Sequence, residues 1–167
     1  MKLKVQFRIA DAFDDKLILS SWLKGAYHLC PSFKDMPKSL FFGMHQPLTK
    51  MLVATTTTLC AVDVEDPTHV LGYIVFKNYT NFSVIHWIYV KQQFRYFGLA
   101  EALLSRANLL PIVFTSHETI ESQRFFNRKK VETFHVPHLR HGEWHESEIS
   151  VFLSSRQDRL KDDQFSS

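Results

Sequence analysis

The centre of the sequence constrains the fold most, because a strand, a helix and a second strand follow one another there with short connections. FSVIHWIYV, residues 82–90, is apolar on both faces, which is typical of a strand inside a sheet. LAEALLSRAN, residues 99–108, predicts a short helix, and PIVFTS, residues 111–116, predicts another buried strand. A strand–helix–strand unit implies that its two strands pair in parallel.

The flanking segments predict the remaining elements of a mixed sheet. Alternating apolar and polar residues predict strands, whereas apolar residues at helical spacing predict helices. Further strands are expected in residues 3–10, in a hairpin at 55–79, and in 131–139 and 146–154; helices are expected in 17–29, 38–52 and 118–130, the second interrupted or ended near Pro47. The fold class is therefore α/β, in the α+β sense: a central, mixed, twisted sheet of six to seven strands flanked by about four helices.

Length and composition favour one domain in a reducing compartment. We expect the domain at residues 1–155 of the 167 and a polar tail at 156–167. No run approaches the roughly 18 to 20 apolar residues of a membrane span, and no signal peptide is visible, so we expect a cytoplasmic protein without a membrane partner. A net charge of +3 and the lack of a recognised binding motif give no reason to expect nucleic acid. Cys30 and Cys60 are expected to be buried free thiols.

The turn between the central strand and its helix predicts an anion site. The N–H groups of a helix's first turn have no partner inside the helix, and the helix dipole adds positive potential. Gly98 removes the Cβ that would block an approaching phosphate, Ala100 keeps the next turn slim, and Arg95 offers a charge-assisted contact. Neither the P-loop pattern GxxxxGK[ST] nor the dinucleotide pattern GxGxxG is present.

The run Arg95-Tyr96-Phe97-Gly98-Leu99-Ala100 resembles the R/Q-x-x-G-x-G/A signature of the GCN5-related N-acetyltransferases (GNAT), in which this turn holds the pyrophosphate of acetyl-CoA. The resemblance extends from about residue 5 to 153 and is most specific in 84–104. It implies a GNAT-like acyl-CoA N-acyltransferase fold, acetyl-CoA as co-substrate, an amine acceptor and no metal. The cofactor-binding residues that it implies are Ile88, Tyr89, Val90, Arg95, Tyr96, Phe97, Gly98, Leu99, Ala100, Thr115 and Phe126.

The resemblance also implies a splayed sheet. The strand with Ile88, Tyr89 and Val90 would diverge from the strand with Phe114 and Thr115, so that the first strand's exposed backbone pairs with the pantetheine amides. The side chains of Tyr89 and Val90 fit an ordinary core equally well.

The catalytic residues depart from the family pattern. Many members carry N-x-x-A-x-x-F-Y on the helix after the splayed strand, with the tyrosine as general acid; here phenylalanine, Phe126, stands at that position. His86 is the best remaining candidate base, although a hydrogen-bonded, half-buried histidine is an alternative reading. It is expected to share a face of its strand with Ile88. His117 is a second candidate acid, but we expect it to begin the following helix.

Two further groups of residues have open interpretations. By analogy with the resembling fold, Trp22, Tyr27 and His28 are candidates for the acceptor wall, with Phe41, Phe42 and His45, although at least half of these six fit the core. The late histidines, His135, His138, His141 and His145 with Glu143 and Glu146, straddle an expected hairpin turn, so we predict solvated polar residues there and no metal site.

Two functions from different classes follow. The first is an acetyl-CoA-dependent N-acetyltransferase acting on a primary amine of a small molecule or a protein. The second is a catalytically weak or inactive GNAT-fold binding or structural protein, consistent with Phe126. A looser resemblance of LILSSWLKGAYH and HWIYVKQQFRYFGLA to small acetyltransferase-like proteins of tailed bacteriophages would make it a phage protein acting on a host partner in the host cytoplasm, or carried in the virion. A protein partner and a monomeric or dimeric state both stay open.

Overall fold

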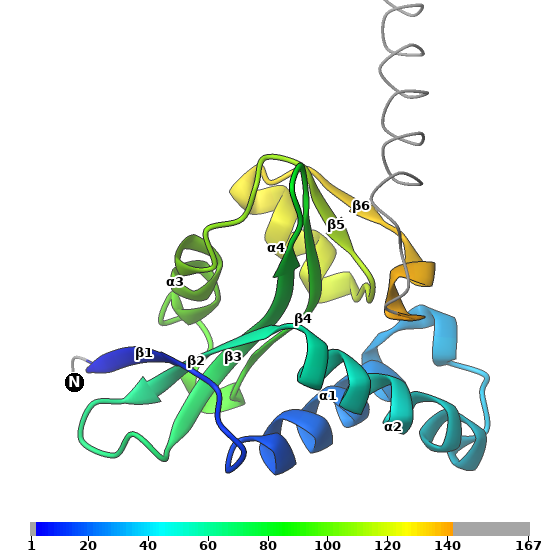
Figure 1. Cartoon of the computed structure of the whole chain (residues 1–167), viewed down its shortest axis with the longest axis horizontal. Helices are drawn as coiled ribbons and strands as arrows, with labels where there is room; N and C mark the ends of the chain where they lie inside the picture. Colours follow the sequence, from blue (N-terminus) through cyan, green and yellow to red (C-terminus); the bar gives the residue numbers. More distant parts are fainter. Residues whose placement is uncertain (1–2, 142–167) are drawn as a thin grey trace, which may run out of the picture.

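The computed structural model describes residues 3–141, apart from the side chain of His138, and its centre is one six-stranded sheet (Figure 1). The strands are β1 (Val5–Ile9), β2 (Thr57–Asp63), β3 (Val70–Asn78), β4 (Ser83–Val90), β5 (Val113–Thr115) and β6 (Thr133–His135), and they lie in this order across the sheet. The first four pair antiparallel, whereas β4, β5 and β6 pair in parallel. This confirms the mixed sheet and the parallel pairing expected at its centre.

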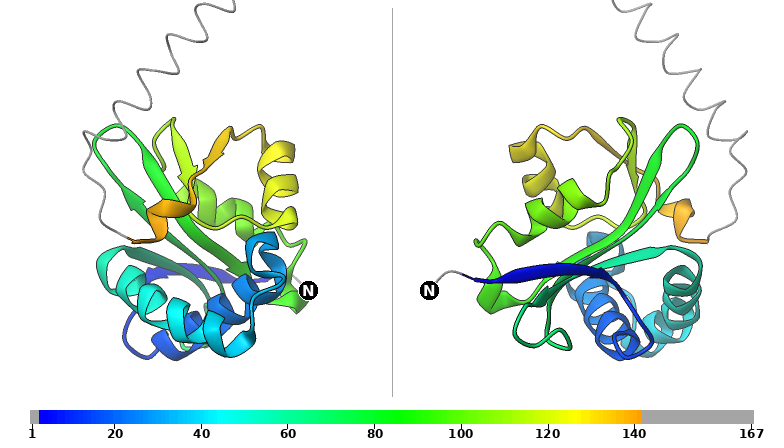
Figure 2. Two further views of the ribbon diagram at one scale, coloured as in Figure 1. Left: turned by 90° about the vertical axis from the view of Figure 1, so that its right-hand side faces the viewer. Right: turned by 60° about the vertical axis from the view of Figure 1, so that its left-hand side comes forward.

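Helices cover both faces of the sheet (Figure 2). One face carries α1 (Asp15–Leu29) and α2 (Lys38–Thr55), and the other carries α3 (Leu99–Arg106) and α4 (Ile120–Lys129). Two separate apolar clusters form between the layers: Trp22 of α1 packs with Trp87 on the first face, and Leu103 of α3 packs with Ile85 on the second. The central strands β3 and β4 are buried on both faces, in keeping with their apolar sequences.

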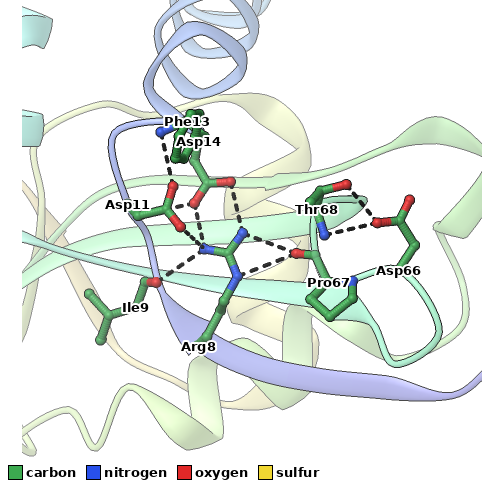
Figure 3. A network of polar contacts seen from close by, with 8 residues as sticks. All are labelled: Arg8, Ile9, Asp11, Phe13, Asp14, Asp66, Pro67 and Thr68. Atoms are coloured by element: carbon green, nitrogen blue, oxygen red, sulfur yellow. Dashed lines mark hydrogen bonds and ion pairs between the residues drawn. The ribbon is translucent and has the colours of Figure 1, made fainter.

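A polar network fixes the start of α1 against the sheet (Figure 3). The guanidinium of Arg8, at the end of β1, makes two hydrogen bonds to the carboxylate of Asp14, of 2.6 and 3.0 Å, and also donates to the carbonyl of Pro67 in the β2–β3 loop. Burial of the Asp14 carboxylate opposes its ionisation, but the hydrogen bonds from Arg8 and from the Asp11 N–H, together with the charge of Arg8, outweigh burial and lower its pKa. The network is structural, because it joins three segments and lies apart from the turn at Gly98.

Two of the expected element boundaries are wrong. Helix α2 does not stop at Pro47 but continues to Thr55, because Phe41, His45 and Leu52 bury one continuous face along it. The strand expected at 131–139 is only β6, since Pro137 lacks an N–H for further pairing and the chain turns into the 3₁₀ helix η3 (Pro137–His141).

Some expectations lie outside the described residues. These are the strand at 146–154, the domain boundary at 155 and the tail at 156–167. Within residues 3–141, no helix combines the length and the apolar character that a bilayer span needs. Cys30 and Cys60 are both free and buried, as expected.

Candidate active site

The strands β4 and β5 diverge in the middle of the sheet. They pair only over Ser83–Ile85 and Val113–Thr115, and the last contact is the hydrogen bond of 3.1 Å from the Ser116 N–H to the Ile85 carbonyl. From there to Val90, β4 is paired with β3 on one side, and no strand of the described chain lies on its other side (Figure 1). The splay expected from the resemblance is therefore present.

The open edge of β4 presents backbone groups. The Lys91 N–H donates to the Leu71 carbonyl of β3 at 2.9 Å. Because successive residues of a strand alternate the side to which their N–H and C=O point, those of Ile88 and Val90 point away from β3. The backbone of these two residues thus faces the gap between β4 and β5.

A β-bulge places His86 at the inner end of this gap. Val75 of β3 pairs with Trp87 and Phe76 pairs with Ile85, so His86 is the extra residue of β4. As a result Ile85 and Ile88 pack in the same cluster with α3, while Trp87 packs toward α1. The expected shared face of His86 and Ile88 is wrong, because the bulge resets the alternation of the strand.

Ser116 joins two buried histidines through its hydroxyl. Its Oγ lies 2.8 Å from Nδ1 of His86 and 2.9 Å from Nδ1 of His117. A hydroxyl has one proton, so with two neutral imidazoles it donates to one ring and accepts from the other. The tautomers of the two histidines are therefore linked, one carrying its proton on Nδ1 and the other on Nε2.

Both histidines of this pair are neutral at neutral pH. Burial, with a smaller contribution from Lys77, lowers the pKa of His86 to about 4. Burial also lowers the pKa of His117 well below its ordinary value, and the positive charge of Arg140 adds to that effect. His117 is not the helix start that the sequence predicted, since α4 begins after Thr119, whose side chain accepts from the Ser122 N–H.

An aromatic pair from two elements encloses His117. Trp22 of α1 stacks on Trp87 of β4 with ring centres 6.1 Å apart, and His117 meets both edge-on at 5.4 and 6.0 Å. The indole N–H groups of Trp22 and Trp87 are buried and have no hydrogen-bond partner within residues 3–141. The cluster therefore keeps two buried donors beside its imidazoles.

The other two acceptor candidates are not brought to this cluster. Tyr27 packs against Phe41 and Phe42, and its hydroxyl donates to the Met36 carbonyl at 3.3 Å. His28 is exposed and touches the ring of Tyr27. Trp22 is thus the one of the three that lies beside the histidines.

The turn at Gly98 is open to solvent. After the 3₁₀ helix η2 (Gln92–Phe94), Tyr96 and Gly98 adopt left-handed conformations with φ of 71° and 77°. A Cβ on Gly98 would meet no atom within 4 Å, and within the described chain no acceptor pairs with the N–H groups of residues 96–101. Arg95 reaches back from this turn, since its Nε donates to the Val90 carbonyl at 3.3 Å. The geometry is suited to an anion.

The side chains of five residues proposed for the cofactor lie in three kinds of position. Tyr96 and Phe97 are exposed on the turn. Leu99 and Phe126 are buried together in the cluster between the sheet and α3, so their side chains belong to the core. Thr115 is buried at the end of β5, where its Oγ1 lies 3.3 Å from Nδ1 of His135.

Sequence reasoning missed two residues of the cluster, Ser116 and Arg140. Ser116 follows a buried strand at its carboxyl end, a position where ligand sites of α/β sheets recur, and this signal could have identified it. Arg140 stands in a polar run that gave no sign of burial, yet its Nε donates to the Ser116 carbonyl at 2.7 Å. Among the described side chains, no group of three or more His, Cys, Asp or Glu is arranged to hold a metal; the side chain of His138 and the residues Glu143, His145 and Glu146 are not among those described.

Comparison with known proteins identifies the fold. No protein-family model matches the sequence, and no curated protein sequence matches it significantly. The structure is similar to an acetyltransferase of the GNAT family from Staphylococcus aureus, with 13% sequence identity, a TM-score of 0.52, and coverage of 75% of this chain and 82% of that one. A Corynebacterium glutamicum structure described as histone acetyltransferase HPA2 and related acetyltransferase gives 14% identity, a TM-score of 0.48, and coverage of 64% and 70%. Together with the mixed sheet and its four helices, the first similarity shows that this chain has the fold of the GNAT acetyltransferases.

Proposed function

We propose that this protein is an acetyl-CoA-dependent N-acetyltransferase that acts on a primary amine of a small molecule or a protein. The observation that carries the proposal is the open edge of β4, which runs from the bulge at His86 to the uncapped turn at Gly98. A ligand that completes this edge must offer amides along its length and an anion at one end, and the pantetheine and diphosphate of acetyl-CoA have this order.

The cofactor would use mainly the backbone. The N–H groups of Ile88 and Val90 and the C=O of Ile88 pair with the pantetheine amides, and the N–H groups around Gly98 receive the diphosphate. Arg95 adds a charge beside that turn, and Thr115 borders the gap from β5. In this arrangement the thioester lies toward the bulge, near His86.

The reaction has to move one proton as it forms one bond. The amine nitrogen attacks the thioester carbonyl carbon, a C–N bond forms, the C–S bond breaks, the amine loses a proton, and the sulfur of CoA gains one. An alkyl amine has a pKa of about 10, so it arrives protonated and first loses that proton to solvent; the proton that the nitrogen loses on attack then needs a base. A neutral imidazole such as that of His86 can accept this proton.

The Ser116 hydroxyl allows this proton to pass from His86 to His117, so that neither imidazole stays charged. When His86 gains a proton at Nε2, it releases the one on Nδ1 to Ser116, and the hydroxyl gives its own proton to Nδ1 of His117. His117 then releases the proton on its Nε2 to the departing sulfur of CoA. Since both rings are neutral before and after the transfer, their low pKa values do not oppose it. This relay would take the part of the tyrosine whose position Phe126 occupies.

Two measurements test the proposal. Acetyl-CoA and CoA are each expected to raise the melting temperature, because a ligand of the native state must stabilise it. Ser116→Ala is expected to lower kcat by about 10²- to 10⁴-fold, the usual contribution of a proton-transfer group, and to leave the acetyl-CoA shift unchanged. His28→Gln, an exposed change on α1, is the control and should keep kcat. The absence of any shift at millimolar acetyl-CoA would contradict the proposal.

The second candidate function, a GNAT-fold binding protein with little or no turnover, is favoured by one observation. Phe126 lies in the core and offers no acid. Stabilisation by acetyl-CoA without release of CoA thiol across a panel of amines would identify this function. In either case the two buried free thiols fit a reducing compartment such as the cytoplasm.

A further inference from the structure

We propose that Arg140 binds an anionic group on the acceptor, so that the acceptor is an amine that also carries a carboxylate or a phosphate. The inference rests on the proposed N-acetyltransferase function and specifies its substrate class. It starts from a cation that the described structure buries without a counter-ion.

Arg140 is held in place by neutral groups. It lies in η3 with 9% of its surface exposed. Its Nε donates to the Ser116 carbonyl at 2.7 Å, and the carbon at the centre of its guanidinium lies 4.8 Å from the centre of the Phe33 ring. These contacts orient the planar group, but neither of them brings a negative charge.

No carboxylate of residues 3–141 forms an ion pair with Arg140. Burial lowers the pKa of Arg140, yet an arginine side chain stays protonated in proteins. The groups whose pKa the charge of Arg140 affects are neutral at neutral pH: burial raises the pKa of Cys30 to about 11 and lowers the pKa values of His45, His117 and His135. Glu118 acts on Cys30 and His135 but forms no ion pair with Arg140. The contrast is Arg8, which is also partly buried and has the carboxylate of Asp14 beside it.

An unpaired buried charge is costly, and a ligand that supplies the opposite charge removes much of that cost. The buried polar atoms without a partner in the described chain are Trp22 Nε1, Thr58 Oγ1 and Trp87 Nε1. Within residues 3–141 no hydrogen bond engages the Nη nitrogens of Arg140, and they are not among these atoms. The free edge of the guanidinium matches a carboxylate or phosphate in shape and charge.

Arg140 lies directly beside the proposed proton relay. Ser116 offers its carbonyl to Arg140 and its hydroxyl to His86 and His117. An anion bound at Arg140 therefore holds the rest of the acceptor next to the groups that would take the amine proton.

The cofactor's phosphates do not compete for this position. They belong to the turn at Gly98, which follows the carboxyl end of β4, whereas Ser116 contacts the opposite half of that strand through Ile85. In Figure 1, η3 lies beside α2 and far from α3. The two positive positions thus lie at different ends of the open edge.

The first experiment uses the unaltered chain of 167 residues and matched pairs of amines. Initial rates are measured for ω-amino carboxylates of increasing length, the corresponding ω-amino amides and aminoalkyl phosphonates. For the best length, kcat/KM of the acid or the phosphonate should exceed that of the amide by about 10- to 100-fold, the range for a hydrogen bond to a charged group. Equal values for acid and amide at every length would overturn the proposal.

The second experiment removes the charge. Arg140→Met should raise KM for the anionic amine by about 10- to 100-fold and leave KM for its amide unchanged. The matched control is Arg106→Met, since Arg106 also lies over a ring, at 4.3 Å from the centre of Phe7, but on α3 and exposed. If Arg140→Met does not fold, Arg140→Gln replaces it, removing the charge and keeping a polar side chain. An unchanged acid-to-amide ratio in the variant that folds would refute the assignment.

Two further readouts separate the causes of failure. The melting-temperature shift with acetyl-CoA reports on the proposed function alone, so a normal shift with no preference for anionic amines rejects only the role of Arg140. Replacement of both Glu143 and Glu146 by Gln tests for a counter-ion from the chain itself. We expect no loss of stability; a loss as large as that of Arg140→Met would give Arg140 an internal partner and overturn the inference.

Discussion

Gly98 is the residue on which the proposed cofactor site depends most. At φ 77° and ψ 9° it begins α3 in the left-handed region, where a side chain is disfavoured. Tyr96 adopts a similar φ two residues earlier, although it carries a Cβ, so the turn holds two such conformations in three residues. Since the backbone strain persists, the rest of the turn must favour this shape strongly.

Gly98→Ala should therefore weaken two properties at once. The left-handed conformation would cost about 1 kcal/mol of folding stability, measured by urea unfolding. The added methyl group also occupies the space where the diphosphate is proposed to lie, so the dissociation constant for acetyl-CoA should rise at least about tenfold, which titration calorimetry measures.

Gly43→Ala is the matched control for this substitution. Gly43 is exposed inside α2, and a Cβ there meets no atom within 4 Å. Alanine should therefore raise stability by about 0.5–1 kcal/mol and leave acetyl-CoA affinity unaltered. If Gly98→Ala also leaves the affinity for acetyl-CoA unchanged, the diphosphate does not bind at this turn.

Site residues whose contacts lie close in the sequence could be predicted, whereas those whose contacts lie far apart in the sequence could not. Gly98 and Arg95 stand in one turn, so the sequence around them was sufficient to single them out. Ser116 and Arg140 meet only because β5 pairs with half of β4 and η3 folds back over the end of β5. A single sequence carries no record of such pairing.

At the scale of elements, the order of strands and helices was predictable and some of their ends were not. Periodicity identified the strand–helix–strand centre, because each of its elements buries a regular pattern of residues. The bulge at His86 was invisible, since one extra residue leaves the composition of β4 unchanged. Pro47 predicted a helix break that is not there, because buried residues of α2 on both sides of the proline keep the helix continuous.

Pro47→Ala should make α2 more stable. A proline inside a helix lacks the N–H that would donate to residue 43, and its ring crowds that carbonyl, at a cost of about 3 kcal/mol. Because Pro47 is exposed, alanine loses no buried contact. We expect thermal or urea unfolding to show a gain of about 1–3 kcal/mol.

Gln46→Ala, an exposed change one position earlier, is the control and should alter stability by less than about 0.5 kcal/mol. A loss of stability in Pro47→Ala would indicate that α2 needs the bend that proline introduces.

At the scale of the whole molecule, the sheet separates an apolar layer from a layer that contains titratable groups. On the side of α3 and α4 the buried cluster includes Ile85, Leu103 and Phe126. The other side buries His45, His86 and His117, and burial lowers the pKa of each. Because folding keeps these histidines neutral where the unfolded chain would protonate them, the free energy of unfolding depends on pH.

Stability should fall as the pH decreases from about 6.5 to 4, because the unfolded chain binds protons that the folded His86 and His117 do not. Each histidine adds a slope of about 1.4 kcal/mol per pH unit within this range and none above it. Urea unfolding at several pH values measures the slope.

His86→Gln should reduce the slope between pH 6.5 and 4, and His28→Gln, an exposed change, should not. A slope that is the same in the His86 variant as in the unaltered chain would mean that His86 is not held neutral by the fold.

The burial of both cysteines has a practical consequence at the bench. Burial raises the pKa of the Cys30 thiol to about 11 and that of Cys60 to about 12, so neither forms thiolate readily while the chain is folded. A chromogenic disulfide reagent added to the assay will then react with the thiol of released CoA and not with the cysteines of the folded chain. Without coenzyme, the same reagent measures unfolding, because each unfolded chain exposes two cysteine thiols that react with it.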